Sequence, residues 1–243
     1  MPVIHSMGMK FAPGDESSNR SNECPDKLPI EPVPSSALGP SRAFSTRLFM
    51  ILILASTSPI RRQMLDAAGV HYETARPDVD EDRIKQGFRG DDEKLAGALA
   101  AAKALSASAH RPGDWVIGSD SLVSVDGKRF DKPDGREQAA AHLRAFSGRE
   151  MVLTSAVALA RDGAMDWHHA EQARLSVRPL SDSFIAAYLD AEWPEVRYCV
   201  GVFRLEGRGV QLFERIEGDH FTILGMPLLP LLGALRERRL MPA

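Results

Sequence analysis

From residue 50 onward, short apolar segments of strand character alternate with longer segments of helical periodicity. The run MILILA, residues 50–55, is typical of a buried strand, and the SPIRRQMLDAAG that follows shortly after is typical of a helix. Ser58 is placed to cap that helix, Pro59 to occupy its first turn and Gly69 to end it. This alternation predicts an α/β fold.

The rest of the chain continues the pattern. Further strands are predicted at 71–75, 114–120, 121–130, 151–160, 171–180 and 209–219. Further helices are predicted at 91–109, 136–146, 181–191 and 226–239. One strand is predicted to end at Asp120, and the pair Asp126-Gly127 beyond it is typical of a hairpin turn.

Composition excludes several classes of partner. The formal net charge of −3 gives no overall attraction to nucleic acid or to an anionic membrane. The longest apolar run, Leu48–Ala55, is far shorter than the roughly 20 residues that a spanning helix requires. Cys24 and Cys199 form neither a disulfide framework nor a metal-ligand spacing. We therefore expect no nucleic-acid partner and no membrane anchor.

Residues 1–49 differ in composition from everything that follows. They are rich in proline and serine and lack hydrophobic periodicity, which predicts a disordered N-terminal extension. A second interpretation is that translation starts at Met50, so that the extension is a mis-called start. Either way, residues 50–243 are predicted to form the folded domain.

The turn after the first strand has the features of an anion site. A strand that enters a helix through small residues directs free backbone N–H groups and the positive end of the helix dipole at one point. Ser56 adds a hydroxyl there, and Arg61 and Arg62 add charge that opposes the dipole unless an anion compensates it. The alternative is a plain helix start with two solvated arginines.

Three other short stretches are candidates for the same site. Asp120 follows a buried strand at the position where α/β sheets place ligands, although it could equally be a turn aspartate. Lys132 follows the predicted hairpin and is either directed back to the site or solvated. Asp78, Asp80 and Glu81 offer oxygen ligands suited to Mg²⁺ or Mn²⁺, or form an ordinary acidic loop.

Five motifs occur together in an order and spacing that resemble the Maf family, also called Maf-like or septum-formation-inhibitor proteins. The resemblance covers residues 50 to about 238. The motifs are LILASTSPIRRQML, PDVDE, IGSDSLV before DKP, FSGR and GDHFTILGMPL.

The resemblance implies a long, twisted mixed β-sheet with flanking helices, similar to inosine triphosphate pyrophosphatases (ITPases). It implies hydrolysis of a nucleoside triphosphate to the monophosphate and pyrophosphate, with a divalent metal, Mg²⁺ or Mn²⁺, in the cytoplasm. A homodimer is compatible with it. The family name also leaves open a non-catalytic regulator of cell division that acts by binding partners.

Individual residues match the family's functional positions. Asp120 matches its proton-accepting aspartate, and Glu81 matches an acidic residue that helps to hold metal. The positions that bind the triphosphate correspond to Ser56, Arg61, Lys103 and Lys132.

Three further positions correspond to those that select the base: Ile60, Ser121 and Glu206. Members that hydrolyse dTTP and UTP have Arg, Thr and Gln there, and this chain has none of the three. An acidic residue at the position of Glu206 resembles the branch that prefers 7-methyl-GTP. That branch has an aromatic residue in place of Ile60 and Gln in place of Ser121, so the match is partial. A dTTP/UTP pyrophosphatase stays the alternative.

Overall fold

A seven-stranded mixed β-sheet forms the centre of the protein. The computed structural model describes residues 50–242, and the predicted extension, residues 1–49, lies outside the described residues. The strands are β1 Leu52–Ala55, β2 Glu73–Ala75, β3 Trp115–Val125, β4 Lys128–Phe130, β5 Glu150–Arg161, β6 Ala164–Val177 and β7 Phe213–Glu217. Their order is β2-β1-β3-β5-β6-β7, and β4 pairs with β3. The predicted α/β class and the mixed sheet are confirmed.

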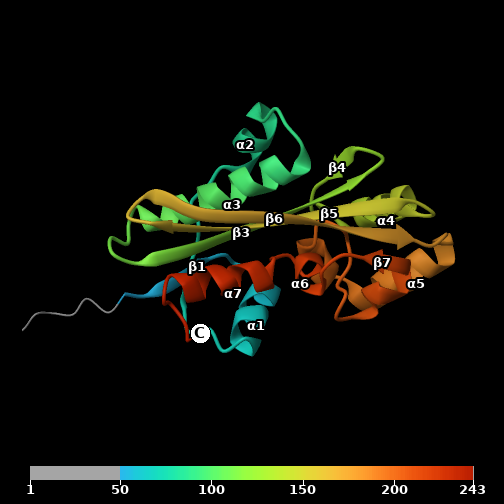
Figure 1. The fold of residues 1–243 in the computed structure, drawn as a ribbon. Helices are drawn as coiled ribbons and strands as arrows, with labels where there is room; N and C mark the ends of the chain where they lie inside the picture. The colour runs from blue at the N-terminus through green and yellow to red at the C-terminus, as the bar shows by residue number, and fades with distance from the viewer. Residues whose placement is uncertain (1–49, 243) are drawn as a thin grey trace, which may run out of the picture. The chain divides into compact units, whose positions relative to one another are not determined.

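Helices flank the sheet on both faces (Figure 1). They are α1 Pro59–Ala67, α2 Glu81–Gly87, α3 Asp92–Ser108, α4 Arg136–Phe146, α5 Asp182–Glu192, α6 His220–Ile223 and α7 Leu228–Glu237. Two 3₁₀ helices, η1 Glu195–Tyr198 and η2 Arg208–Leu212, complete the set. Helices α2 and α3 lie on one face, and α1, α6 and α7 lie on the other. Within residues 50–242, no helix combines the length and apolar character needed to cross a bilayer.

Helix α3 packs close to β3 where small residues of the helix, Ala100 and Ala104, face Gly118. The residues that it buries include Leu95, Ala96, Leu99 and Ala100. At the closest point a Cβ added to Gly118 would lie 2.1 Å from the carbonyl oxygen of Ala100, so only glycine fits in β3 there. This contact brings the second half of α3 directly over the middle of β3.

Strand β3 differs from its prediction, because it does not end at Asp120. It continues to Val125, and β5 pairs with it along the whole range Trp115–Val125. The partner strand satisfies the backbone of β3 beyond Asp120, so no local feature forces the strand to stop there. The predicted hairpin is present: Asp126 and Gly127 both have positive φ, as a two-residue turn requires.

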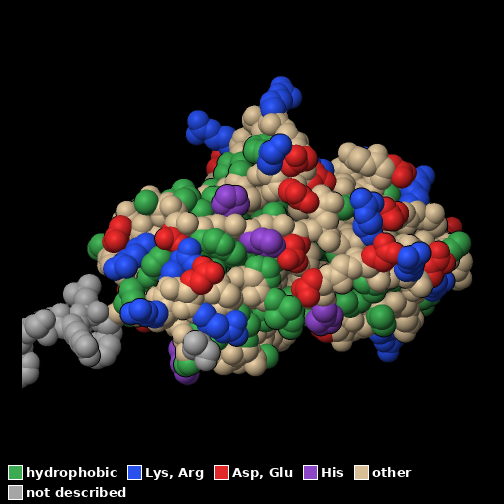
Figure 2. Space-filling view, viewed as in Figure 1, with side chains coloured by type: hydrophobic (Ala, Val, Ile, Leu, Met, Phe, Trp, Pro, Cys, Tyr) green, Lys and Arg blue, Asp and Glu red, His purple; other side chains and the backbone are tan. Residues whose placement is uncertain are grey.

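Two smaller differences concern short segments. The acidic stretch considered as a loop contains the start of helix α2 at Glu81, capped by Asp80, whose side chain accepts the backbone N–H of Arg83. The strand predicted at 209–219 is shared between η2 and β7. On the face drawn in Figure 2, acidic and basic side chains are interspersed.

Candidate active site

The site lies at a gap in the sheet beside β3. Strand β1 covers one edge of β3 as far as Gly118, where Ala55 is its last partner. Strand β4 covers the same edge only from Val123 onward. The segment 119–122 between them has no strand partner on that edge. Its side chains alternate, so that Asp120 faces α3 while Ser119 and Ser121 face the turn between α6 and α7.

On the α3 face, one lysine joins two carboxylates. The Nζ of Lys103 lies 2.5 Å from Oδ1 of Asp120 and 2.8 Å from Oε1 of Glu81. The side chains of Lys103 and Asp120 are each 9% exposed, whereas that of Glu81 is 39% exposed. Because an unpaired buried charge is costly, this ammonium stabilises both carboxylates in place. The predicted meeting of Asp120, Lys103 and Glu81 is therefore present.

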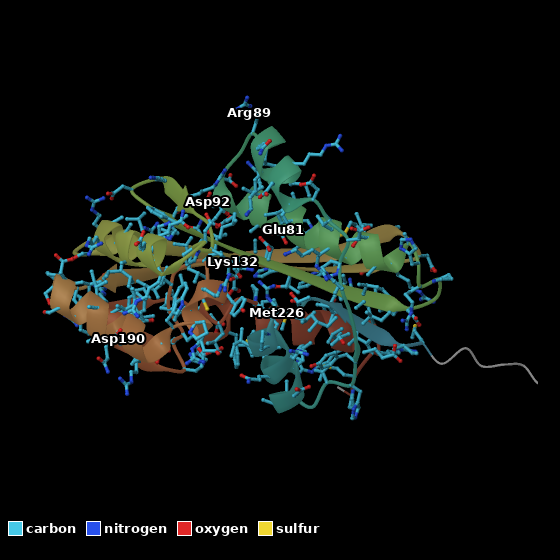
Figure 3. All side chains as sticks on the ribbon, turned by 180° about the vertical axis from the view of Figure 1, so that it is seen from behind. Glu81, Arg89, Asp92, Lys132, Asp190 and Met226 are labelled. Carbon is cyan, nitrogen blue, oxygen red and sulfur yellow. The ribbon has the colours of Figure 1, made fainter. Side chains whose placement is uncertain are left out.

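Three lysines act on the carboxylate of Glu81. Partial burial on its own would raise the pKa of Glu81, but the ammonium groups of Lys103, Lys85 and Lys132 outweigh it, and the pKa is lowered. Figure 3 shows Glu81 and Lys132 at the centre of the molecule. Lys132 is exposed and has no ion-pair partner among residues 50–242. It is thus available to an anion that enters the gap.

Lys85 was not anticipated from the sequence. It projects from α2 and pairs with Asp131, the neighbour of Lys132, at 2.6 Å. Burial on its own would lower the pKa of Lys85, but Asp131, Glu81 and Asp120 raise it. The only signal in the sequence was a lysine four residues after Glu81, which places both on one side of a helix.

Arg61 fills the edge of the gap itself. Its Nε donates to the carbonyl oxygen of Gly225 at 2.9 Å, and Nη1 donates to the carbonyl oxygen of Ser119 at 2.9 Å. Nη2 donates to the Oγ of Ser121 at 3.0 Å, and Nη1 lies 3.4 Å from the Oγ of Ser56. The alternative of two solvated arginines is thus wrong for Arg61. Arg62, by contrast, is exposed.

Two backbone carbonyl groups accept hydrogen bonds from the positively charged guanidinium of Arg61. The sequence had suggested an anion as the partner of this charge. Burial lowers the pKa of Arg61, and the negative charges of Asp120 and Glu81 oppose that shift. A guanidinium stays protonated at physiological pH in either case. Most of its N–H groups are already donated to the protein, so a direct bond to phosphate stays a prediction.

The remaining small residues of the site have different surroundings. Ser56 is buried, and its Oγ accepts the backbone N–H of Ser58 at 3.2 Å. Ile60 lines an apolar groove with Met64 of α1, Phe221 of α6 and Leu228 of α7. Ser121 belongs to the Arg61 side of the sheet. Of the three positions matched to base selection, Ser121 is the one whose side chain hydrogen-bonds to Arg61 within the described residues.

Glu206 lies in an exposed turn before η2. The sequence also allows Glu206 to face solvent and pair with Arg204 or Arg208. Arg204 pairs instead with the buried carboxylate of Glu192 at 2.9 Å, and Glu206 forms no ion pair with Arg208 within residues 50–242. Burial, with a smaller contribution from the Glu206 charge, raises the pKa of the Cys199 thiol to about 11 against the opposing effects of Arg204 and Lys132.

The donor set suits a hard divalent cation. No group of three or more His, Cys, Asp or Glu within residues 50–242 could hold a metal ion. Asp120 and Glu81, however, converge on one point, which the Lys103 ammonium occupies. Mg²⁺ is commonly bound through one or two carboxylates, with the rest of its shell supplied by water and substrate phosphates. The pair fits that pattern.

The fold and this site define an α/β protein with a buried carboxylate among cations. A model of the Maf-like protein family matches residues 51–238. A nucleoside triphosphate pyrophosphatase of Sphingopyxis alaskensis is 47% identical over 197 residues, which cover 79% of this chain and 100% of the relative. A 7-methyl-GTP pyrophosphatase of Rhizobium etli is 48% identical over 191 residues, 76% of this chain and 95% of the relative. The chain belongs to the Maf-like family, which confirms the resemblance.

Among solved structures, a nucleoside-triphosphatase / dITP/XTP pyrophosphatase of Mycobacterium abscessus is 18% identical. It aligns with a TM-score of 0.35 over 53% of this chain and 73% of that chain. That likeness is too low to support a conclusion about function.

Proposed function

We propose that the chain hydrolyses a nucleoside triphosphate to the nucleoside monophosphate and pyrophosphate. Family membership carries the enzyme class, because relatives that are 47% and 48% identical are named for this activity. The observation that carries the proposal is the cluster of Asp120, Lys103 and Glu81 at the gap, with Lys132 and Arg61 beside it. A module that only binds partners has no need for a buried carboxylate held against a lysine.

We assign each group a step of the reaction. A water oxygen attacks the α-phosphorus, the bond from that phosphorus to the oxygen bridging to the β-phosphate breaks, and pyrophosphate leaves with the electron pair. Asp120 accepts a proton from the attacking water. Its contacts to Lys103 use Oδ1, which leaves Oδ2 for that water. Lys132 and Lys103 stabilise the charge that develops on the leaving pyrophosphate.

A divalent cation is part of the proposal. Held by Asp120 and Glu81 beside the Lys103 ammonium, it would neutralise charge on the triphosphate. The residues of the chain then hold the substrate in place: Lys132 on the open side of the gap, and Arg61 with Ser56 at the start of α1.

Replacement of Asp120 tests the mechanism. Asp120→Asn keeps the shape and can still accept a hydrogen bond from Lys103, but it cannot take up the proton. We expect pyrophosphate release to fall by about 10²–10⁴-fold with an unchanged circular-dichroism spectrum. Asp126→Asn is the matched control, because Asp126 lies in the exposed turn after the same strand and asparagine accepts its positive φ. Near-wild-type turnover of Asp120→Asn would remove Asp120 from the mechanism.

For the base, we propose 7-methylguanine. The carboxylate of Glu206 can accept hydrogen bonds from the ring N–H and the exocyclic amine of guanine, a donor pair that uracil and thymine lack. The positive charge of a 7-methylated ring favours the carboxylate further. The 7-methyl-GTP pyrophosphatase of Rhizobium etli, which is 48% identical, supports this choice. So does the ion pair of Arg204 with Glu192, which leaves the Glu206 carboxylate without an ion pair among residues 50–242.

A comparison of substrates tests this choice. Wild-type kcat/KM should be higher for 7-methyl-GTP than for UTP or dTTP. Glu206→Gln should narrow that difference by lowering kcat/KM for 7-methyl-GTP. Glu214→Gln, an exposed carboxylate in β7, serves as control and should change neither value. Equal efficiency of the wild type on UTP and 7-methyl-GTP would show that Glu206 does not select the base.

A further inference from the structure

Three donors converge on one backbone carbonyl beside Arg61. The oxygen of Gly225 lies 2.9 Å from the Nε of Arg61, 3.1 Å from the Oγ of Ser119 and 3.1 Å from the Oγ of Ser121. A carbonyl oxygen has two lone pairs, so it cannot accept full hydrogen bonds from three donors at once. One of the two serines has to direct its proton elsewhere.

Ser155 of β5 resolves this competition. It is fully buried, and its Oγ lies 2.8 Å from the carbonyl oxygen of Thr222 and 2.9 Å from the Oγ of Ser121. A carbonyl can only accept, so the single proton of Ser155 is donated to Thr222. Ser155 therefore accepts from Ser121, and the carbonyl of Gly225 is left to Arg61 and Ser119.

The result is a hydrogen-bond chain with one direction. Arg61 donates to Ser121, Ser121 donates to Ser155, and Ser155 donates to the backbone of Thr222. The far end is anchored to β6, because the Oγ1 of Thr222 donates to Glu171 at 2.6 Å. The chain thus crosses three strands of the sheet on the face opposite Asp120.

We infer that Ser155 is a positioning residue, which holds the guanidinium of Arg61 at the gap through Ser121 and through the segment that carries Gly225. The inference rests on the proposed function, in which Arg61 contributes to the phosphate site. Without the Ser155 hydroxyl, Ser121 turns its proton to Gly225 and competes there with Arg61. The backbone of Thr222 loses its donor at the same time. Both changes loosen Arg61 without touching Asp120 or Lys103.

The test compares two neighbours on one strand. Ser155→Ala removes the link, whereas Thr154→Val is the matched control: Thr154 is also fully buried, and its hydroxyl has no hydrogen-bond partner among the described residues. We expect Ser155→Ala to lower kcat/KM by about 10- to 100-fold, as misplacement of a substrate-binding group does. Thr154→Val should retain wild-type kcat/KM.

A double-mutant cycle separates positioning from a general structural role. If Ser155 acts through Arg61, then Ser155→Ala should lower kcat/KM less than about twofold in an Arg61→Ala background. Full additivity of the two losses would overturn the inference. If Ser155→Ala fails to fold, Thr222→Val is used instead, because it removes only the hydrogen bond from Thr222 to Glu171. The decrease in kcat/KM caused by Thr222→Val should likewise vanish in the Arg61→Ala background.

A second readout does not depend on turnover. In the ¹⁵N-labelled full chain, the Nε–H resonance of Arg61 is identified as the one lost in Arg61→Lys. We expect its exchange with solvent to be at least about tenfold faster in Ser155→Ala than in the wild type or Thr154→Val. Unchanged exchange would overturn the inference. An inactive wild type with the expected exchange difference would instead refute the proposed function and leave the positioning role established.

Discussion

Lys103→Met removes the ammonium that lies between Asp120 and Glu81 while keeping most of the apolar stem that packs in α3. The side chain of Asp120, which is 9% exposed, then lacks its cation. Breaking a buried ion pair in this way costs about 3–5 kcal/mol. Because Glu81 is 39% exposed, solvent screens its interaction with Lys103. We therefore take the lower end of this range, about 3 kcal/mol of unfolding free energy. For a domain of this size that corresponds to a fall in Tm of about 6–12 °C.

The stability lost in Lys103→Met should be larger at neutral pH than at acidic pH. In the wild type, the lysines lower the pKa of Glu81, so their stabilisation is present above its unfolded pKa and is lost as the pH falls through the folded value. In Lys103→Met, burial is no longer outweighed to the same degree, so the pKa of Glu81 rises and protonation relieves the repulsion. The difference in Tm between the two proteins should therefore be largest near pH 7.5 and should shrink towards about pH 4.5.

Differential scanning fluorimetry at both pH values measures this, with and without Mg²⁺. In Lys103→Met the cation can occupy the point between the carboxylates, and at ten times its Kd it should restore about 1.4 kcal/mol. Lys94→Met on the same helix is the control, because the Lys94 side chain is 73% exposed and pairs only with exposed Asp91. This substitution should change the free energy of unfolding by less than about 0.5 kcal/mol. A Tm difference that is equal at both pH values would refute the reasoning.

Two further substitutions test the surroundings of the site by urea denaturation. Gly225→Ala should destabilise by about 1–3 kcal/mol, because Gly225 has φ +106° and an added Cβ would lie 3.2 Å from Ser121 Oγ. Gly233→Ala, a helical glycine with open space around it, should be neutral or stabilising; a neutral Gly225→Ala would contradict the argument. Glu192→Gln should cost about 2 kcal/mol by removing the charge that pairs with Arg204. A loss below about 0.5 kcal/mol would show that this ion pair is dispensable.

Local sequence was sufficient for most of the elements of the fold. The helix starts at the N-cap positions Ser58 and Ser181, the hairpin at Asp126-Gly127 and the alanine-rich helix that carries Lys103 all occur where the pattern predicts them, although only Ser181 of the two serines makes a side-chain capping bond. These features depend on interactions within a few residues, which a sequence displays directly. The five motifs also identified the family, and with it Asp120, Lys103 and Glu81 as members of one site.

Only the tertiary structure decided how these residues meet. Strand β3 continues past Asp120 because β5, which follows only after β4 and helix α4, pairs with it along its full length. The gap exists because β1 and β4 cover different parts of one edge. Arg61 finds its acceptors in Ser119 and Gly225, which lie 58 and 164 residues away along the chain. Such pairings are set by packing between distant segments, and no periodicity within either segment contains them.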